Sequence, residues 1–244
     1  MHMNSKTSCI WVDSLRPAVL LVASVVVALG VGAGSAVAYD AAADFSTNTN
    51  PNGVWSYGWS TNLGSSLQLY TTPALNAGFN IWTYTNLYPY VAHNGTTNTI
   101  TVANAHQVLQ AGQMAAHPGA NGEYSIVRWT APLAGSYSIA ASFAGADQDG
   151  DSADVHVLDN STSIFNGDVF GFGTPTSFST NLVLGAGDTI DFAVGYGSDR
   201  SYYDDLTAMS AVVIPEPTTF ALAAAGLACA VAFGSRRRKW FSVG

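Results

Sequence analysis

Cysteine is nearly absent from this chain. The 244 residues include two cysteines, Cys9 and Cys229, and both lie in the terminal segments, so the stretch 39–214 has none. A disulfide framework of the kind that stabilises small secreted domains is therefore excluded for that stretch. A domain of this length buries about 70% of the surface that its unfolded chain exposes, so one core suffices without cross-links.

Positive charge is also scarce. Residues 39–214 contain no lysine, and only Arg128 and Arg200 oppose fourteen carboxylates, which gives a formal charge of −12. Such a surface repels nucleic acid and anionic lipid, and it tolerates cations and neutral polymers. We therefore expect no nucleic-acid partner.

Helical periodicity is largely missing from the centre of the chain, apart from a short candidate helix at 103–113. Apolar residues instead alternate with period two, which is typical of half-buried strands. Six such strands are expected at 125–130, 137–143, 154–158, 178–184, 190–194 and 206–214, with further strands around Trp55, Leu67, Ile81 and Ile100. Short turn-rich joins favour an all-β fold, an antiparallel β-sandwich of jelly-roll type that spans 39–214.

The first 38 residues have the composition of a secretory signal. Lys6 and Arg16 precede an apolar run at 18–34, and small residues follow, including Ala36 and Ala38. This three-part pattern predicts a signal helix that signal peptidase removes by cutting between Ala38 and Tyr39. An uncleaved membrane anchor is the alternative, and the small residues at the cleavage site argue against it.

Residues 215–244 form a second three-part pattern. Pro215, Glu216 and Pro217 precede an apolar stretch at 218–234, and a basic cluster follows, made of Arg236, Arg237, Arg238 and Lys239. The seventeen residues of this stretch reach the short limit for a transmembrane helix across a core of about 30 Å. The basic end should stay on the cytoplasmic side, which places 39–214 outside the membrane. The pattern fits either a permanent anchor or a handle that is later removed.

This tail resembles the PEP-CTERM sorting tail of diderm bacteria in its Pro-Glu-Pro motif, its apolar span and its terminal arginines. The resemblance implies processing by an exosortase, a protease embedded in the membrane. It also implies export across the inner membrane, with a destination in the outer envelope, at the cell surface or in an extracellular polysaccharide matrix.

A second resemblance lies in the phrase from Arg128 through Ala131-Pro132 to Tyr137. An aromatic strand, an Ala-Pro stop, a glycine turn and an apolar strand are similar to those of carbohydrate-binding-module-like and galactose-binding-like sandwiches. The proline ends one strand and the glycine permits the hairpin. This resemblance gives more support to the predicted fold than to the identity of any ligand.

The densest group of carboxylates consists of Asp147, Asp149, Asp151 and Asp154. Alternating Asp oxygens in a glycine-containing loop can supply the hard ligands that calcium requires, although the spacing is not that of an EF-hand. Calcium is therefore the candidate cofactor, and a solvated acidic loop is the alternative. The pair Asp204-Asp205 would join this group if both loops share one end of the sandwich.

Aromatic residues offer a candidate carbohydrate site. Trp55, Tyr57 and Trp59 alternate along one strand, and Tyr202 and Tyr203 lie in an expected loop. Exposed rings can stack on sugar faces, whereas buried rings would simply pack in the core.

Catalytic motifs are not apparent. The sequence has neither an H-E-x-x-H zinc motif nor a G-x-S-x-G elbow, so we expect a non-catalytic protein that binds polysaccharide or calcium weakly. Two alternatives stay open: a polysaccharide hydrolase with two carboxyl groups about 5–10 Å apart, and an adhesin or self-assembling subunit with an exposed apolar patch. Arg128, in the middle of a strand, is expected to pair with an Asp.

Overall fold

The computed structural model describes residues 37–84, 87–150 and 152–217, and residues 36–216 form one compact unit. The predicted signal and transmembrane helices lie outside the described residues, as do Ala36, Asp151 and the arginines Arg236, Arg237 and Arg238. Within the described ranges, no helix is long and apolar enough to cross a bilayer.

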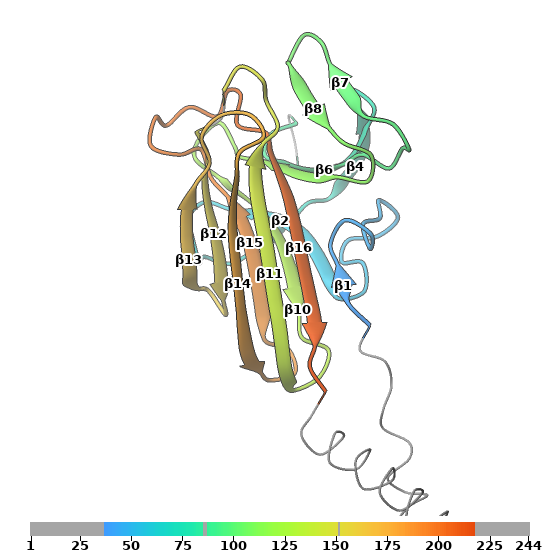
Figure 1. Ribbon diagram of the computed structural model, residues 1–244, viewed down its shortest axis with the longest axis vertical. Helices are drawn as coiled ribbons and strands as arrows, with labels where there is room; N and C mark the ends of the chain where they lie inside the picture. The colour runs from blue at the N-terminus through green and yellow to red at the C-terminus, as the bar shows by residue number, and fades with distance from the viewer. Residues whose placement is uncertain (1–36, 85–86, 151, 218–244) are drawn as a thin grey trace, which may run out of the picture. The chain divides into compact units, whose positions relative to one another are not determined.

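Two antiparallel sheets face each other and make up most of the molecule (Figure 1). The larger, eight-stranded sheet has the order β14-β11-β16-β9-β6-β5-β4, with β1 beside β16. Its strands are β1 (Tyr39–Asp40), β4 (Thr72–Asn76), β5 (Phe79–Thr83), β6 (Tyr90–His93), β9 (Met114–His117), β11 (Gly135–Gly145), β14 (Pro175–Leu184) and β16 (Thr207–Pro215).

The smaller sheet has six strands in the order β13-β12-β15-β10-β2-β3, and a separate hairpin joins β7 to β8. Its strands are β2 (Trp55–Ser60), β3 (Gln68–Leu69), β10 (Tyr124–Thr130), β12 (Asp154–Asp159), β13 (Thr162–Asp168) and β15 (Thr189–Val194); the hairpin is β7 (Ile100–Val102) and β8 (Gln107–Leu109). The predicted antiparallel, all-β sandwich is thus confirmed for the described residues.

Period-two alternation builds the core between these sheets. On β11, Tyr137, Ile139, Ala141 and Phe143 are buried, while Ser138, Ala140 and Ser142 between them are more exposed. From the opposite sheet, Trp129 and Phe192 fill the same space and are fully buried. Burying each large apolar side chain contributes roughly 1.5–3 kcal/mol, so the alternation fixes which face of each strand turns inward.

The prediction of a helix at 103–113 is wrong, because this segment contains the turn that follows β7, strand β8 and the turn after it. Gln107 and Leu109 are buried and Val108 lies between them less buried, so the local period is two. His106 enters the strand with a φ of 49°, and Gly112 leaves it with a φ of 70°. Both angles lie in the left-handed region, which interrupts a right-handed helix.

The two ends of the described chain lie together at one end of the sandwich. Tyr39 on β1 pairs with Val213 near the end of β16. At the opposite end, β11 stops at Gly145 beside Thr207, the first residue of β16, and β10 starts at Tyr124 beside Ser60. The loops after β5, β9, β11 and β15 therefore gather at the end remote from the termini (Figure 1).

Candidate functional site

A cleft of about 480 Å³ opens among these gathered loops. It is lined by Trp59, Tyr84, Tyr88, Pro89, Ala120, Asn121, Glu123 and Tyr202. Trp59 belongs to the end of β2, whereas the other residues follow β5, precede β10 or precede β16. The cleft is thus a product of the tertiary fold, since four separate segments contribute to it.

Four of the eight residues that line the cleft carry aromatic rings. The rings of Trp59 and Tyr84 lie 5.0 Å apart, and Tyr202 meets Tyr88 edge-on at 5.3 Å between centroids. Such separations are favourable for aromatic pairs and hold the rings in place. Tyr84 is 43% exposed, so part of this wall faces solvent.

Glu123 and Asn121 supply the carboxylate and the side-chain amide of the cleft. The backbone N–H and the side-chain Nδ2 of Asn121 each donate a 2.9 Å hydrogen bond to the Glu123 carboxylate. Partial burial favours the protonated form of Glu123, but these hydrogen bonds outweigh it and hold its pKa below the ordinary value. Glu123 is therefore a carboxylate at neutral pH and can only accept hydrogen bonds.

His117 packs against Tyr88, one of the residues that line the cleft. Its ring lies 4.5 Å from that of Tyr88 and stacks on Tyr90 at 5.1 Å. Nδ1 lies 2.9 Å from the carbonyl oxygen of Pro118, so this nitrogen carries the proton. Burial lowers the pKa of His117 to about 4, and the ring is neutral at physiological pH.

Three carboxylates form an acidic cluster at the same end of the sandwich. One oxygen from each of Asp147, Asp149 and Asp204 lies within 4.8 Å of the others, a separation that could hold a metal ion. Asp149 also contacts His106 Nδ1 at 2.5 Å, and its N–H donates to Asp147. Burial, with a further contribution from Asp204 and Asp149, raises the pKa of Asp147.

The acidic cluster and the cleft are neighbours. Burial raises the pKa of Tyr88, and the negative charges of Asp147 and Asp204 raise it further. Tyr202 lines the cleft, and Asp204 follows it by two residues on the same loop. Any cation held by the cluster would therefore lie close to a ligand in the cleft.

The end of the domain remote from the cleft carries a recognised sequence motif. A family model described as the PEP-CTERM protein-sorting motif matches residues 213–239. The chain carries this sorting motif. Exported proteins bear the PEP-CTERM motif, so the match indicates export, with processing by an exosortase. The motif begins within β16, where Pro215 pairs with Tyr137 and the Glu216 N–H donates to the Ser136 carbonyl at 2.8 Å.

Among solved structures, the chain is similar to several carbohydrate-binding modules with a β-sandwich fold. They include CBM51 from Clostridium perfringens GH95, solved with methyl-galactose (12% identity, TM-score 0.33, 60% of this chain and 94% of that one). A family 35 module from Clostridium thermocellum aligns with 11% identity and a TM-score of 0.29 over 60% of this chain and all of the module (100%). The C-terminal CBM6 of LamC from Zobellia galactanivorans aligns with 15% identity and a TM-score of 0.27, over 42% and 80% of the two chains. No curated protein sequence matches the chain. These likenesses are remote, so a ligand has to be inferred from the cleft itself.

Two of the predicted carbohydrate residues lie away from the cleft. Trp55 and Tyr57 are buried in the core, where Trp55 Nε1 donates to Asp44 and Tyr57 packs on Phe45. All three aromatic residues of β2 share one face, but only Trp59 lies where the strand leaves the sandwich and reaches the cleft. Of the predicted loop residues, Tyr202 lines the cleft, while Tyr203 is exposed and packs on Tyr202 at 4.5 Å.

The structure also revises the predicted metal ligands. Asp147 and Asp149 do come together, and Asp204 joins them, as expected if the two loops share an end. Asp154 does not belong to this cluster. Its carboxylate instead lies 2.7 Å from His156 Nε2 and accepts hydrogen bonds from the Tyr124 hydroxyl and the Gly197 N–H.

Four residues that line the cleft were not predicted from the sequence as site residues: Tyr84, Tyr88, Asn121 and Glu123. A usable signal was present for the last two, because an Asn-Gly-Glu turn directly precedes a predicted strand at the same end as the acidic loops. Tyr84 and Tyr88 flank a loop whose position in space depends on the whole sheet order, which the sequence pattern does not contain.

Proposed function

We propose that the protein is an exported, non-catalytic component of the cell envelope or extracellular matrix that binds polysaccharide in the aromatic cleft. The observation that carries this proposal is the wall of four aromatic rings, Trp59, Tyr84, Tyr88 and Tyr202, beside one carboxylate and one amide. Flat rings pack against the apolar faces of sugars, and the carboxylate and amide can fix their hydroxyl groups.

The ionisation state of Glu123 favours binding over hydrolysis. Glycoside hydrolysis needs a pair of carboxyl groups across the scissile bond, usually with one held protonated by a raised pKa. Among the described residues that line the cleft, Glu123 is the one carboxylate, and its pKa is lowered. This arrangement suits a hydrogen-bond acceptor for sugar hydroxyls and is a poor general acid.

The proposed route to the envelope uses both ends of the chain. Signal peptidase would cut between Ala38 and Tyr39, and exosortase would act at the Pro215-Glu216-Pro217 motif after the span at 218–234 has held the protein in the inner membrane. The pairing of Tyr39 with Val213 supports this arrangement, because it puts both processing sites at the end remote from the cleft. A tethered or newly released domain would then present its cleft outward.

The acidic cluster supports a second, separate proposal, a weak calcium site formed by Asp147, Asp149 and Asp204. Three carboxylates whose oxygens lie within 4.8 Å of one another repel each other, and a divalent cation would relieve this repulsion. Bound calcium would also fix the loops before β12 and β16, and with them Tyr202.

A glycan array tests the binding proposal. The purified protein should bind neutral or amino-sugar oligosaccharides more strongly than uronic-acid or sulfated ones, because the domain carries a formal charge of −12. Trp59→Ala should abolish binding. Phe170→Ala removes an exposed ring that does not line the cleft and should leave binding unchanged. An absence of binding to any glycan, with and without calcium, would contradict the proposal and leave a purely structural role.

A further inference from the structure

Strand β14 ends the larger sheet and exposes a long, regular edge. Its ten residues, Pro175–Leu184, pair with β11 from Ala144 to Gly135 without a register shift. Among the described strands, none pairs with the other side of β14. Half of its backbone N–H and C=O groups therefore face away from the sheet, in a row that another extended chain could pair with.

The other sheet edges carry features that discourage such pairing. Strand β3 has two residues, and β4 has five with Pro73 inside it. Strand β13 contains Asp168, and its ladder with β12 has a register shift between Val157 and Leu158. Short length, proline, charge and irregularity are the usual protections of edge strands. Apart from a proline at its first position, β14 has none of them.

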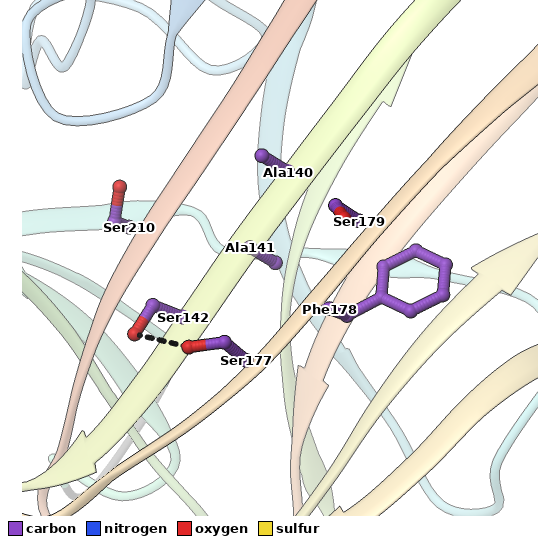
Figure 2. A pocket seen from close by; sticks show the side chains of 7 residues that line it. All are labelled: Ala140, Ala141, Ser142, Ser177, Phe178, Ser179 and Ser210. Carbon is purple, nitrogen blue, oxygen red and sulfur yellow. Dashed lines mark hydrogen bonds between the residues drawn. The ribbon is translucent and has the colours of Figure 1, made fainter.

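Strand β14 and its neighbour β11 contain no charged side chain. The outer face beside it is a shallow hollow of about 330 Å³ lined by Ala140, Ala141, Ser142, Ser177, Phe178, Ser179 and Ser210. Figure 2 shows the hydroxyl groups of Ser142 and Ser177 directed at one another across β11 and β14, 3.3 Å apart. None of these side chains would place a charge beside a strand that pairs with β14.

Exposed apolar side chains occur on β14, on β13 and in the connection between these strands. Val183, on β14, is 84% exposed, and Phe170, in the connection that enters β14, is 65% exposed. Ile164 on β13 and Phe172 before β14 are exposed as well. Exposed apolar side chains beside an unpaired strand can add apolar contacts to its pairing.

We propose that β14 pairs antiparallel with β14 of a second copy of this chain, so that two eight-stranded sheets become one continuous sheet. An antiparallel strand is complementary to itself about a two-fold axis, and each contact then forms twice. Two domains of formal charge −12 repel each other over most of their surface, and an edge without carboxylates is where they can meet. The cleft lies at one end of the sandwich, so edge pairing leaves it open.

Sedimentation velocity over a range of concentrations tests this proposal with two matched variants. Ser179→Lys places a charge on the exposed face of β14, and Ser210→Lys makes the same change on β16, two strands inside the sheet. Both lower the net negative charge equally, which by itself favours association. Lysines facing each other across the new ladder should weaken dimerisation about threefold to fivefold in Ser179→Lys, and Ser210→Lys should change it less than about twofold.

Two results would overturn the proposal. The first is a wild-type protein that stays monomeric at every concentration up to the millimolar range. The second is a dimer that Ser179→Lys leaves intact or that both variants weaken equally, since the interface would then lie elsewhere. Circular dichroism of both variants confirms that each is folded, which is expected because both serines are exposed.

Discussion

Arg128 on β10 faces Asp191 on β15, and its guanidinium binds both oxygens of the carboxylate. Nε lies 2.6 Å from Oδ1 and the terminal nitrogen lies 2.7 Å from Oδ2. The two residues are direct partners in the antiparallel register, and Asp191 is buried. This confirms the expectation that Arg128 pairs with an Asp, and the pair joins two central strands of the smaller sheet.

Removing only the arginine should be costly. Arg128→Ala leaves a buried carboxylate without its partner, and such changes typically cost about 3–5 kcal/mol. Urea denaturation measures the loss in the free energy of unfolding. The double variant Arg128→Leu, Asp191→Leu should lose much less, because both charges are removed together. Equal losses in the single and double variants would show that packing, not charge pairing, explains the effect.

The burial of neutral His117 predicts a loss of stability in acid. Its pKa is about 4 in the folded state and 6.5 when exposed, so the unfolded chain binds a proton more readily. His117 therefore does not lower the free energy of unfolding above pH 6.5. It lowers it progressively as the pH falls from 6.5 toward 4, and below pH 4 it lowers it no further. At about 1.36 kcal/mol per pKa unit, the total from His117 is about 3 kcal/mol.

His117→Asn tests this window, because the amide can donate to the Pro118 carbonyl but does not titrate. The free energy of unfolding of this variant should decline less than that of the wild type between pH 6.5 and 4. His106→Asn serves as the control, since the His106 side chain is 51% exposed. A wild-type decline that His117→Asn leaves unaltered would contradict the assignment.

Calcium should raise the melting temperature through the acidic cluster. At a calcium concentration 100 times the Kd, binding to the folded state alone adds about 2.7 kcal/mol. Asp204→Asn should eliminate this increase, while Asp168→Asn, an exposed carboxylate outside the cluster, should retain it. Because the pKa of Asp147 is raised, the effect should fade on acidification earlier than at an ordinary aspartate site. Equal calcium responses in both variants would reject the site.

Glu123→Gln should weaken glycan binding without abolishing it. The amide keeps the size of the side chain but loses the charge, and hydrogen bonds to charged groups contribute about 1.5–3 kcal/mol. Isothermal titration calorimetry should show a Kd raised at least about tenfold, consistent with that range. In the wild type, binding should persist below the ordinary pKa of glutamate, because the pKa of Glu123 is lowered. Unchanged affinity in the variant would remove Glu123 from the site.

The fold was predictable where one face of a strand meets the core. The alternation in β11 and β14 is complete enough to reveal both the strands and their buried sides. The alternation of buried Gln107 and Leu109 in β8 was too short to be distinguished from a helical pattern. The order of strands was not predictable, because most neighbours in the larger sheet are distant in sequence.

The candidate site was predictable only in part, for a related reason. Composition identified the acidic loops and Tyr202, because carboxylates and rings in turn-rich segments stand out locally. Trp55 and Trp59 look equivalent in sequence, and only the point where β2 leaves the sandwich separates a core residue from a cleft residue. Tyr88 and Glu123 enter the site through tertiary packing alone.

The most direct test of the binding cleft follows the tryptophan indole N–H signals by NMR during titration with the oligosaccharide that binds most strongly on the array. The account predicts that the Trp59 signal, assigned with Trp59→Phe, shifts with a saturable curve. The signals of buried Trp55 and Trp129 should stay in place. A saturating titration in which Trp59 does not move, or moves no more than Trp55 and Trp129, would contradict the account.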